Sequence, residues 1–165
     1  MSQVPYEIVP PAGVAGWHRN IDRLWRYVRA IAPGGGMPSR RDFDPVDIPD
    51  LLPRIWMLDV ALDPFALTYR LCGTMETASL ERDPTGQSFM DVHADRIARE
   101  PHFLDRYRHM ARTGEATWRR GRLVLGHNDR HKTVENLMVP MTDGGAAVAI
   151  LLCYSLVFRA DGSLY

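Results

Sequence analysis

The longest apolar segment of this chain is the feature that most limits how it can fold. The nine residues Ala146–Tyr154 are all apolar, and they lie in a strand-like segment that ends at Phe158. A membrane-spanning helix needs about 20 such residues, so this segment is too short to cross a bilayer. Side chains of a strand alternate between the two faces of its sheet. A strand that is apolar at both parities therefore predicts a sheet covered on both faces.

Hydrophobic periodicity and turn residues predict an α+β chain. In order, we expect a helix at 17–32, strands at 55–61 and 67–72, helices at 74–81 and 91–113, and strands at 116–126, 132–141 and 146–158. Pro101 is expected either to divide the second helical segment after the first hairpin or to lie in the first turn of its second half. Four prolines between residues 37 and 53 predict an ordered connector with short turns. This order lacks the strand–helix alternation of a doubly wound nucleotide-binding fold.

Length, charge and cysteine content limit the class of protein. The 165 residues fit one domain, which we place at 17–158 with its first helix at 17–32, an N-terminal arm at 1–16 and a C-terminal tail at 159–165. Lys and Arg together number 20, as do Asp and Glu, so the basic surplus of a general nucleic-acid binder is missing. No secretory signal is recognisable, and two distant cysteines fit a reducing compartment. We therefore expect a cytoplasmic protein that binds neither nucleic acid nor membrane.

Five stretches of the sequence carry a resemblance to a known family. They are LWRYVRAIA, MPSRRDFDPVDIPDLLPRIWMLDV, LTYRLCGT, RDPTGQSF and AVAILLCYSLVF. Together with the element order, they resemble small bacterial proteins that consist of little more than one PAS domain. The resemblance implies a five-stranded antiparallel sheet in the order 2-1-5-4-3, with helices between strands two and three and an additional N-terminal helix. It also implies a sensing or interaction role in signalling, with no catalytic residues to carry over.

The predicted strand order separates the two cysteines. Cys72 falls in strand two and Cys153 in strand five, with strand one between them. Two strand spacings amount to about 10 Å, which exceeds the roughly 7 Å that a disulfide can bridge. We expect both thiols to be free.

Some PAS domains hold haem on a histidine of the helical segment, and this chain has two histidines there. His102 and His109 lie seven residues apart on one helical stripe, about 200° away from Leu104 and thus on the polar side. A haem ligand must face the core. Haem binding is therefore disfavoured.

A metal or a flavin is likewise not expected. His127 and His131 fall in a polar loop with His93 elsewhere, which does not make a convergent set of three or four ligands. A flavin photosensor would need a reactive cysteine in the helical segment, whereas Cys72 and Cys153 fall in strands. We expect no cofactor.

Two acidic residues occur inside otherwise apolar strands. Asp59 and Glu135 are candidates for a general base if they are buried with a raised pKa. The alternative is a structural ion pair, for example with Arg70 or Arg122, or exposure on the outer face. We favour the structural interpretation.

The residue pattern also suggests two surfaces. If the domain binds a ligand, the candidate pocket is lined by Tyr69, Met75, Leu104, Tyr107, Leu125, Leu137 and Leu151. The first helix carries an apolar stripe that is a candidate homodimer interface, made of Trp17, Ile21, Leu24, Trp25, Val28 and Ile31.

The leading hypothesis is a non-catalytic PAS regulatory module that binds a signalling partner and a small, largely apolar ligand. One alternative is a small enzyme or carrier with a curved α+β cone fold, which would place a carboxylate in a deep cavity. The other is a pure interaction scaffold with a filled core. An open cavity distinguishes the sensor from the scaffold.

Overall fold

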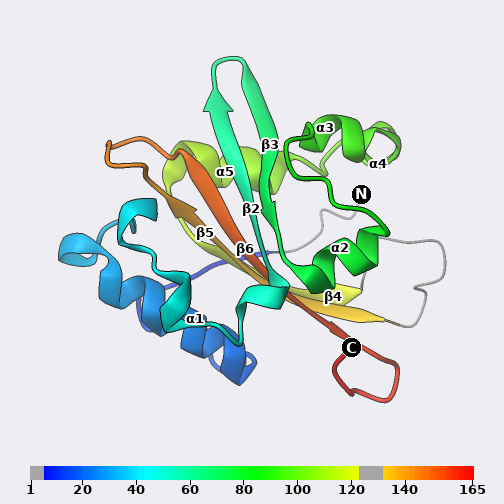
Figure 1. Ribbon diagram of the computed structural model, residues 1–165, viewed down its shortest axis with the longest axis horizontal. Coiled ribbons are helices and arrows are strands. Elements are labelled where there is room, and N and C mark those ends of the chain that lie inside the picture. Colours follow the sequence, from blue (N-terminus) through cyan, green and yellow to red (C-terminus); the bar gives the residue numbers. More distant parts are fainter. Residues whose placement is uncertain (1–5, 123–131) are drawn as a thin grey trace.

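The computed structural model describes residues 6–122 and 132–165 (Figure 1). In chain order the elements are β1 (Glu7–Ile8), α1 (Arg19–Ile31), β2 (Ile55–Leu62), β3 (Phe65–Cys72), α2 (Thr74–Leu80), α3 (Phe89–Val92), α4 (Ala94–Arg99), α5 (Asp105–Thr113), β4 (Thr117–Arg122), β5 (Thr133–Met141) and β6 (Ile150–Phe158). None of the described helices is long and apolar enough to cross a membrane.

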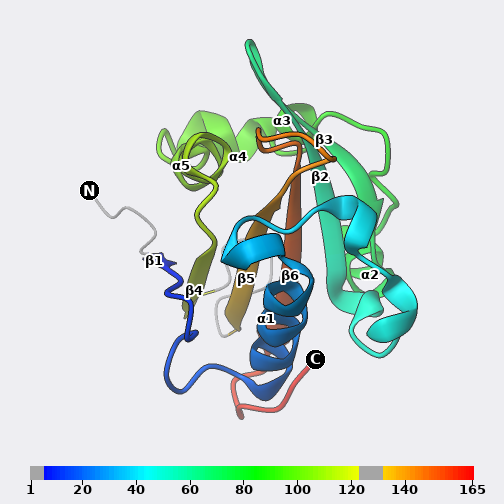
Figure 2. The same cartoon turned by 90° about the vertical axis from the view of Figure 1, so that its left-hand side faces the viewer.

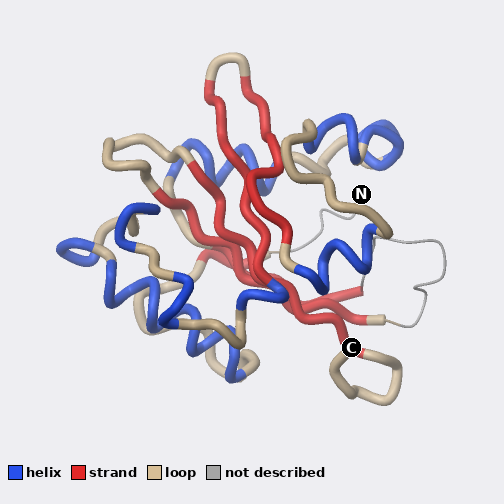
Figure 3. Tube along the Cα trace, viewed as in Figure 1, coloured by secondary structure: helices blue, strands red, loops and turns tan. Residues whose placement is uncertain are grey.

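All strands belong to one antiparallel sheet in the order β1-β4-β5-β6-β2-β3 (Figure 3). Its last five members have the strand order that the PAS resemblance implied, so the predicted fold is confirmed. The sixth strand comes from the N-terminal arm, where Ile8 is paired with Thr117 at the edge of β4. This short strand carries little apolar periodicity, and the sequence therefore gave no sign of it.

The central strands are buried on both faces, as the apolar pattern predicted. On β6, Leu152 and Tyr154 belong to the core on the α1 side, whereas Leu151 and Cys153 belong to the core on the opposite side. Figure 2 shows α1 in front of β5 and β6. Helices α3 and α5 contribute to the other core, through residues such as Phe89. The sheet is thus the middle layer of three.

The predicted dimer stripe of α1 packs within its own chain. Ile21 and Leu24 are fully buried against the sheet, and Val28 is nearly so. Trp25 is also buried and donates a hydrogen bond from Nε1 to the carbonyl of Pro11 at 3.1 Å. The stripe therefore covers the sheet of its own chain and is not a free dimer surface. Helical periodicity showed correctly that these residues are buried, but it did not show which surface buries them.

Trp17 and Ile31, at the two ends of the predicted stripe, are half-buried and pack against the edge of the same core. Trp17 also meets Trp25 edge-on, with ring centroids 6.3 Å apart. Both residues thus belong to the intramolecular contact of α1.

The connector between α1 and β2 forms part of this layer. It makes four short 3-10 turns, at Pro33–Gly35, Arg40–Asp42, Pro45–Asp47 and Leu52–Arg54. Phe43, Ile48 and Leu51 are buried in the core beside α1. The backbone of Arg40 donates to the carbonyl of Thr142 at 2.8 Å, which ties the connector to the end of β5. The proline-rich segment is therefore ordered, as predicted.

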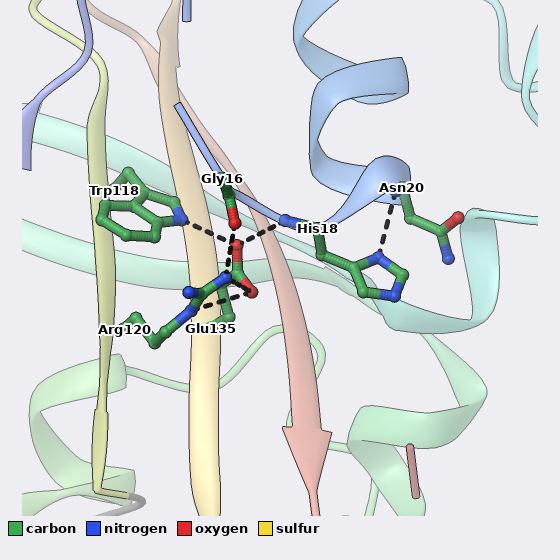
Figure 4. Close-up of polar contacts among 6 residues, drawn as sticks. All are labelled: Gly16, His18, Asn20, Trp118, Arg120 and Glu135. Atoms are coloured by element: carbon green, nitrogen blue, oxygen red, sulfur yellow. Dashed lines mark hydrogen bonds and ion pairs between the residues drawn. The ribbon is translucent and has the colours of Figure 1, made fainter. Parts of the chain in front are cut away.

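A buried carboxylate holds the start of α1 against the sheet. Glu135 of β5 is 1% exposed, and its Oε1 accepts hydrogen bonds from the backbone N–H of His18 at 2.8 Å and from Nε1 of Trp118 at 3.1 Å (Figure 4). Its Oε2 accepts from Nη2 of Arg120 at 2.9 Å, and the same guanidinium donates to the carbonyl of Gly16. Because His18 is the N-cap of α1, this carboxylate positions the helix.

The structural interpretation of both strand carboxylates is confirmed. Asp59 pairs with Arg70 at 2.9 Å, and both side chains are nearly half exposed. Glu135 pairs with Arg120 and not with Arg122, because Arg120 lies directly opposite it in the register of β4 and β5. One pair is thus a surface contact and the other a core contact.

The helical segment predicted at 91–113 is three helices. The first two, α3 and α4, meet at His93, and α5 begins only at Asp105. Ser88 caps α3 by accepting from the N–H of Asp91. Pro101 lies in the turn between α4 and α5, where its missing N–H ends the helix, as expected. The break at His93 had no signal in the sequence, because it accompanies a long-range contact of that side chain.

Both cysteines are free, and β2 separates them as predicted. Trp56 of β2 is paired with Cys72 on one side and with Cys153 on the other.

The two strand carboxylates allow a matched test of this layer. We expect Glu135→Ala to lower the free energy of unfolding by about 2–4 kcal/mol, because buried donors of Trp118 and His18 lose their acceptor. Asp59→Ala removes an exposed ion pair and should cost less than about 1 kcal/mol. Urea denaturation measures both. Equal losses would contradict the role of Glu135 in holding α1.

Candidate functional site

A cavity of about 820 Å³ lies on the sheet face opposite α1. Its walls come from α2, the α3–α4 segment, α5 and strands β2 to β6, and include Met75, Phe89, Tyr107, Asn136 and Ser155. Its volume is in the usual range for small-molecule sites. A smaller hollow of about 460 Å³ beside α5 is lined largely by exposed residues such as Leu62 and Arg112, so the larger cavity is the candidate site.

Aromatic rings form one wall of the cavity. Phe89 is 1% exposed and lies parallel to Trp56 and to Phe103, with centroid separations of 6.4 and 5.9 Å. Tyr107 packs against Phe89 at 5.0 Å. Tyr107 is tilted by 50° against Phe89, so the wall combines parallel and inclined rings and offers an aromatic, apolar surface to a ligand.

A buried histidine–tyrosine pair lies beside this wall. Nε2 of His93 is 2.7 Å from the hydroxyl oxygen of Tyr69, and both residues line the cavity. Burial lowers the pKa of His93 to about 4, with a further contribution from nearby Arg96 and Arg82. Burial also raises the pKa of Tyr69. At neutral pH both groups are uncharged, and together they give the wall a polar point of contact.

Arg106 of α5 is a buried cation in the cavity wall. Its Nε donates to the hydroxyl of Thr117 at 2.8 Å, Nη1 donates to Oδ1 of Asn136 at 2.8 Å, and Nη2 donates to the carbonyl of Thr117 at 3.1 Å. Burial lowers its pKa to about 10, so the guanidinium stays charged at neutral pH. Its hydrogen bonds are to neutral groups.

Glu76 of α2 is the carboxylate of the cavity whose charge changes near neutrality. Burial raises its pKa to about 7, partly offset by the positive charge of Arg54. The cavity therefore combines a fixed basic region around Arg106 with an acid that is half ionised near pH 7.

Three of the predicted pocket residues line the cavity, namely Tyr69, Met75 and Tyr107. Leu104 and Leu151 lie in the core cluster of the same face, and they are packed behind the cavity wall. Nothing in strand parity alone distinguishes a residue at the cavity surface from one beneath it.

Leu137 lies on the wrong face for the predicted pocket. It is fully buried in the core under α1, and its neighbours Asn136 and Met138 face the cavity together with Val134 of the same strand. The prediction assigned the wrong face of β5 to the cavity. Both faces of this strand are buried and largely apolar, so the sequence pattern does not show which alternate residues point to the cavity. Leu125 lies outside the described residues.

The other histidines occupy different places. His102 lies at the rim, nearly half exposed, with Nδ1 2.9 Å from Asp105. His109 pairs with Glu115 at 2.9 Å on the far side of α5 from the aromatic wall. His127 and His131 lie outside the described residues. Among the residues that are described, no group of three or more His, Cys, Asp or Glu side chains is placed to hold a metal ion.

Sequence reasoning missed the polar residues of the cavity. His93 was considered only as a metal ligand, and Arg106 and Glu76 were not singled out. Each is one charged or polar residue in or between short helices, where exposure is the ordinary expectation. Tyr69, the partner of His93, and Asn136, a partner of Arg106, are 24 and 30 residues away in the chain.

Comparison with known proteins identifies the fold. No protein-family model and no curated protein matches the sequence. A solved structure titled "Structure of an RNA-binding Light-Oxygen-Voltage Receptor" is similar, with a TM-score of 0.50 and 16% identity. The match covers 96% of this chain and 40% of that one, so the chain spans less than half the length of its structural neighbour. The fold is that of PAS and light-oxygen-voltage domains.

Two cavity residues, His93 and Glu76, have shifted pKa values that predict opposite effects of pH on stability. The pKa of His93 is lowered from 6.5 to about 4, so its contribution to stability is lost as pH falls from 6.5 towards 4. The pKa of Glu76 is raised from 4.5 to about 7, so its contribution is lost as pH rises from 4.5 towards 7. In the wild type these slopes oppose each other between about pH 4.5 and 6.5.

We expect Glu76→Gln to remove the loss above pH 4.5, so that stability rises more steeply with pH than in the wild type. His93→Asn should have the reverse effect and leave stability falling with pH. Urea denaturation at half-unit steps from pH 4.5 to 7.5 measures both slopes. Parallel pH profiles for the two variants and the wild type would contradict the assigned environments.

Proposed function

We propose that this chain is a non-catalytic PAS sensory module that binds a small molecule in the cavity between its sheet and α2 to α5. The observation that carries the proposal is the cavity itself, about 820 Å³ on the helical face of a PAS sheet. An aromatic wall and a few polar groups are the usual composition of a small-molecule site. Occupancy would be read out through a signalling partner.

The open cavity supports a sensor over a scaffold with a filled core. The enzyme alternative rested on a cone fold, and the observed strand order is that of a PAS domain instead. A cavity carboxylate is nevertheless present, in Glu76. It is explained as part of the ligand environment, since the fold is typical of sensory modules.

The partners of the chain are part of this proposal. RNA binding is stated for the structural neighbour, and a shared fold at 16% identity does not transfer it. The balanced charge of this chain gives no reason to add it, so nucleic acid stays outside the proposal. The free cysteines agree with the cytoplasm as its compartment. A homodimer, if formed, would use a surface other than the buried stripe of α1.

Filling the cavity tests the proposal. Met75 on α2 lines the cavity and is 37% exposed, so a larger side chain at this position can project into the open space. We expect the neutral dye N-phenyl-1-naphthylamine to bind one-to-one to the wild type and at least about tenfold more weakly to Met75→Trp. Fluorescence titration measures the affinity, and native mass spectrometry of protein purified without refolding reveals any retained ligand.

Val46→Trp is the matched control, because Val46 is 79% exposed in the connector and far from the cavity lining. It should leave dye binding unchanged. Absence of one-to-one binding, or equal binding by Met75→Trp and the wild type, would refute the cavity as the ligand site.

A further inference from the structure

The cavity wall holds a charged guanidinium whose described contacts are all neutral. Arg106 is 9% exposed, and none of the described ion pairs involves it. Its three hydrogen bonds go to Thr117 and Asn136. Burial of a cation without a counter-charge is costly, so an anion at this place would be strongly stabilised.

A second guanidinium lies beside the first. Arg119 of β4 is directly opposite Asn136 in the strand register, and Asn136 is the residue that binds Arg106. The positive charge of Arg119 contributes to the lowered pKa of Arg106, whose largest cause is burial. Nε of Arg119 is buried and has no hydrogen-bond partner among the described residues. A donor is therefore left unused next to a buried cation.

Arg96 of α4 extends this basic region. It contacts Glu100 at 3.3 Å, and its guanidinium lies 4.5 Å from the ring centre of Phe103. Its Nε, like that of Arg119, is buried without a partner in the described part of the chain. The basic region thus reaches the aromatic wall.

The excess of positive charge is local to the cavity. Six basic residues are among the described cavity residues, against three acidic ones, although the whole chain has a formal net charge of zero. The basic residues are Arg54, Arg82, Arg96, Arg106, Arg119 and Lys132, and the acidic ones are Glu76, Glu81 and Asp105. A concave surface of one charge sign concentrates ligands of the opposite sign.

We propose that the cavity binds a small organic anion with a planar aromatic body, whose carboxylate pairs with Arg119 and Arg106 while its ring packs on the wall around Phe89. This inference rests on the proposed function and names its ligand class. A carboxylate matches the fork of donors on a guanidinium. The aromatic wall takes the apolar remainder of the ligand. The sequence predicted a largely apolar ligand, and the buried arginines change that expectation.

A pair of probes that differ only in charge tests the proposal. Naphthalene-2-carboxylate and naphthalene-2-carboxamide share one ring system, and isothermal titration calorimetry of the full chain at pH 7.5 gives both affinities. We expect the acid to bind at least about tenfold more tightly than the amide, because charge-assisted hydrogen bonds are stronger than neutral ones.

Arg119→Gln is the main variant, since the described side-chain hydrogen bond of Arg119 is an exposed, local one to the carbonyl of Arg122, and the substitution keeps the backbone pairing of β4 with β5. It should weaken binding of the acid about tenfold and leave the amide within about twofold. Arg106→Lys keeps the positive charge but loses the paired N–H donors of the guanidinium, and it should weaken binding of the acid by less than Arg119→Gln does. Arg112→Gln, an exposed arginine on the same helix as Arg106, is the matched control and should change neither affinity.

Equal binding of acid and amide by the wild type would overturn the proposal, as would acid binding that is unaffected by both cavity variants. So would failure of both probes to bind while N-phenyl-1-naphthylamine still occupies the cavity. These outcomes leave the sensory cavity itself intact. If the neutral dye also fails to bind one-to-one, the proposed function fails together with the ligand class.

Discussion

Burial of β5 and β6 on both faces is the constraint on which the rest of this structure depends. Each strand places apolar side chains on both faces of the sheet, and a single layer of helices could cover only one face. Helix α1 and the proline-rich connector supply one cover, and α3 with α5 supplies most of the other. The two layers that cover the sheet differ in how they pack. The first is closely packed, whereas the second encloses the cavity.

The core under α1 contains a buried hydrogen-bond network around the carboxylate of Glu135. Glu135 is almost fully buried, yet both of its carboxylate oxygens accept hydrogen bonds. Oε1 accepts from the backbone N–H of His18, the N-cap of α1, and Oε2 accepts from Arg120. Desolvation makes such a buried ion pair a poor source of net stability. Its geometric requirement is strict, however, because three segments must meet at one carboxylate. The consequence is a defined position for the start of α1.

Apolar patterning was sufficient to predict which segments are strands and that the sheet is covered on both faces, because alternation and turns report directly on both, whereas the strand order came from the resemblance to PAS domains. The same information failed wherever a partner had to be identified. The apolar stripe of α1 is buried against the sheet of its own chain, whereas helical periodicity does not tell which surface covers such a stripe. Leu137 was placed on the wrong face because both parities of β5 are apolar. His93 and Arg106 became visible only once Tyr69 and Asn136 were beside them.

Strand β5 carries one contact toward the cavity and one toward α1 on adjacent residues. Asn136 holds Arg106 on the cavity side, and the preceding residue, Glu135, holds the N–H of His18 on the other side. Because consecutive side chains of a strand point in opposite directions, a rotation of this dipeptide about the strand axis moves both contacts at once. A displacement of Asn136 on the cavity side would therefore also shift the Glu135 carboxylate that accepts from the N-cap of α1, because the two residues share one peptide bond.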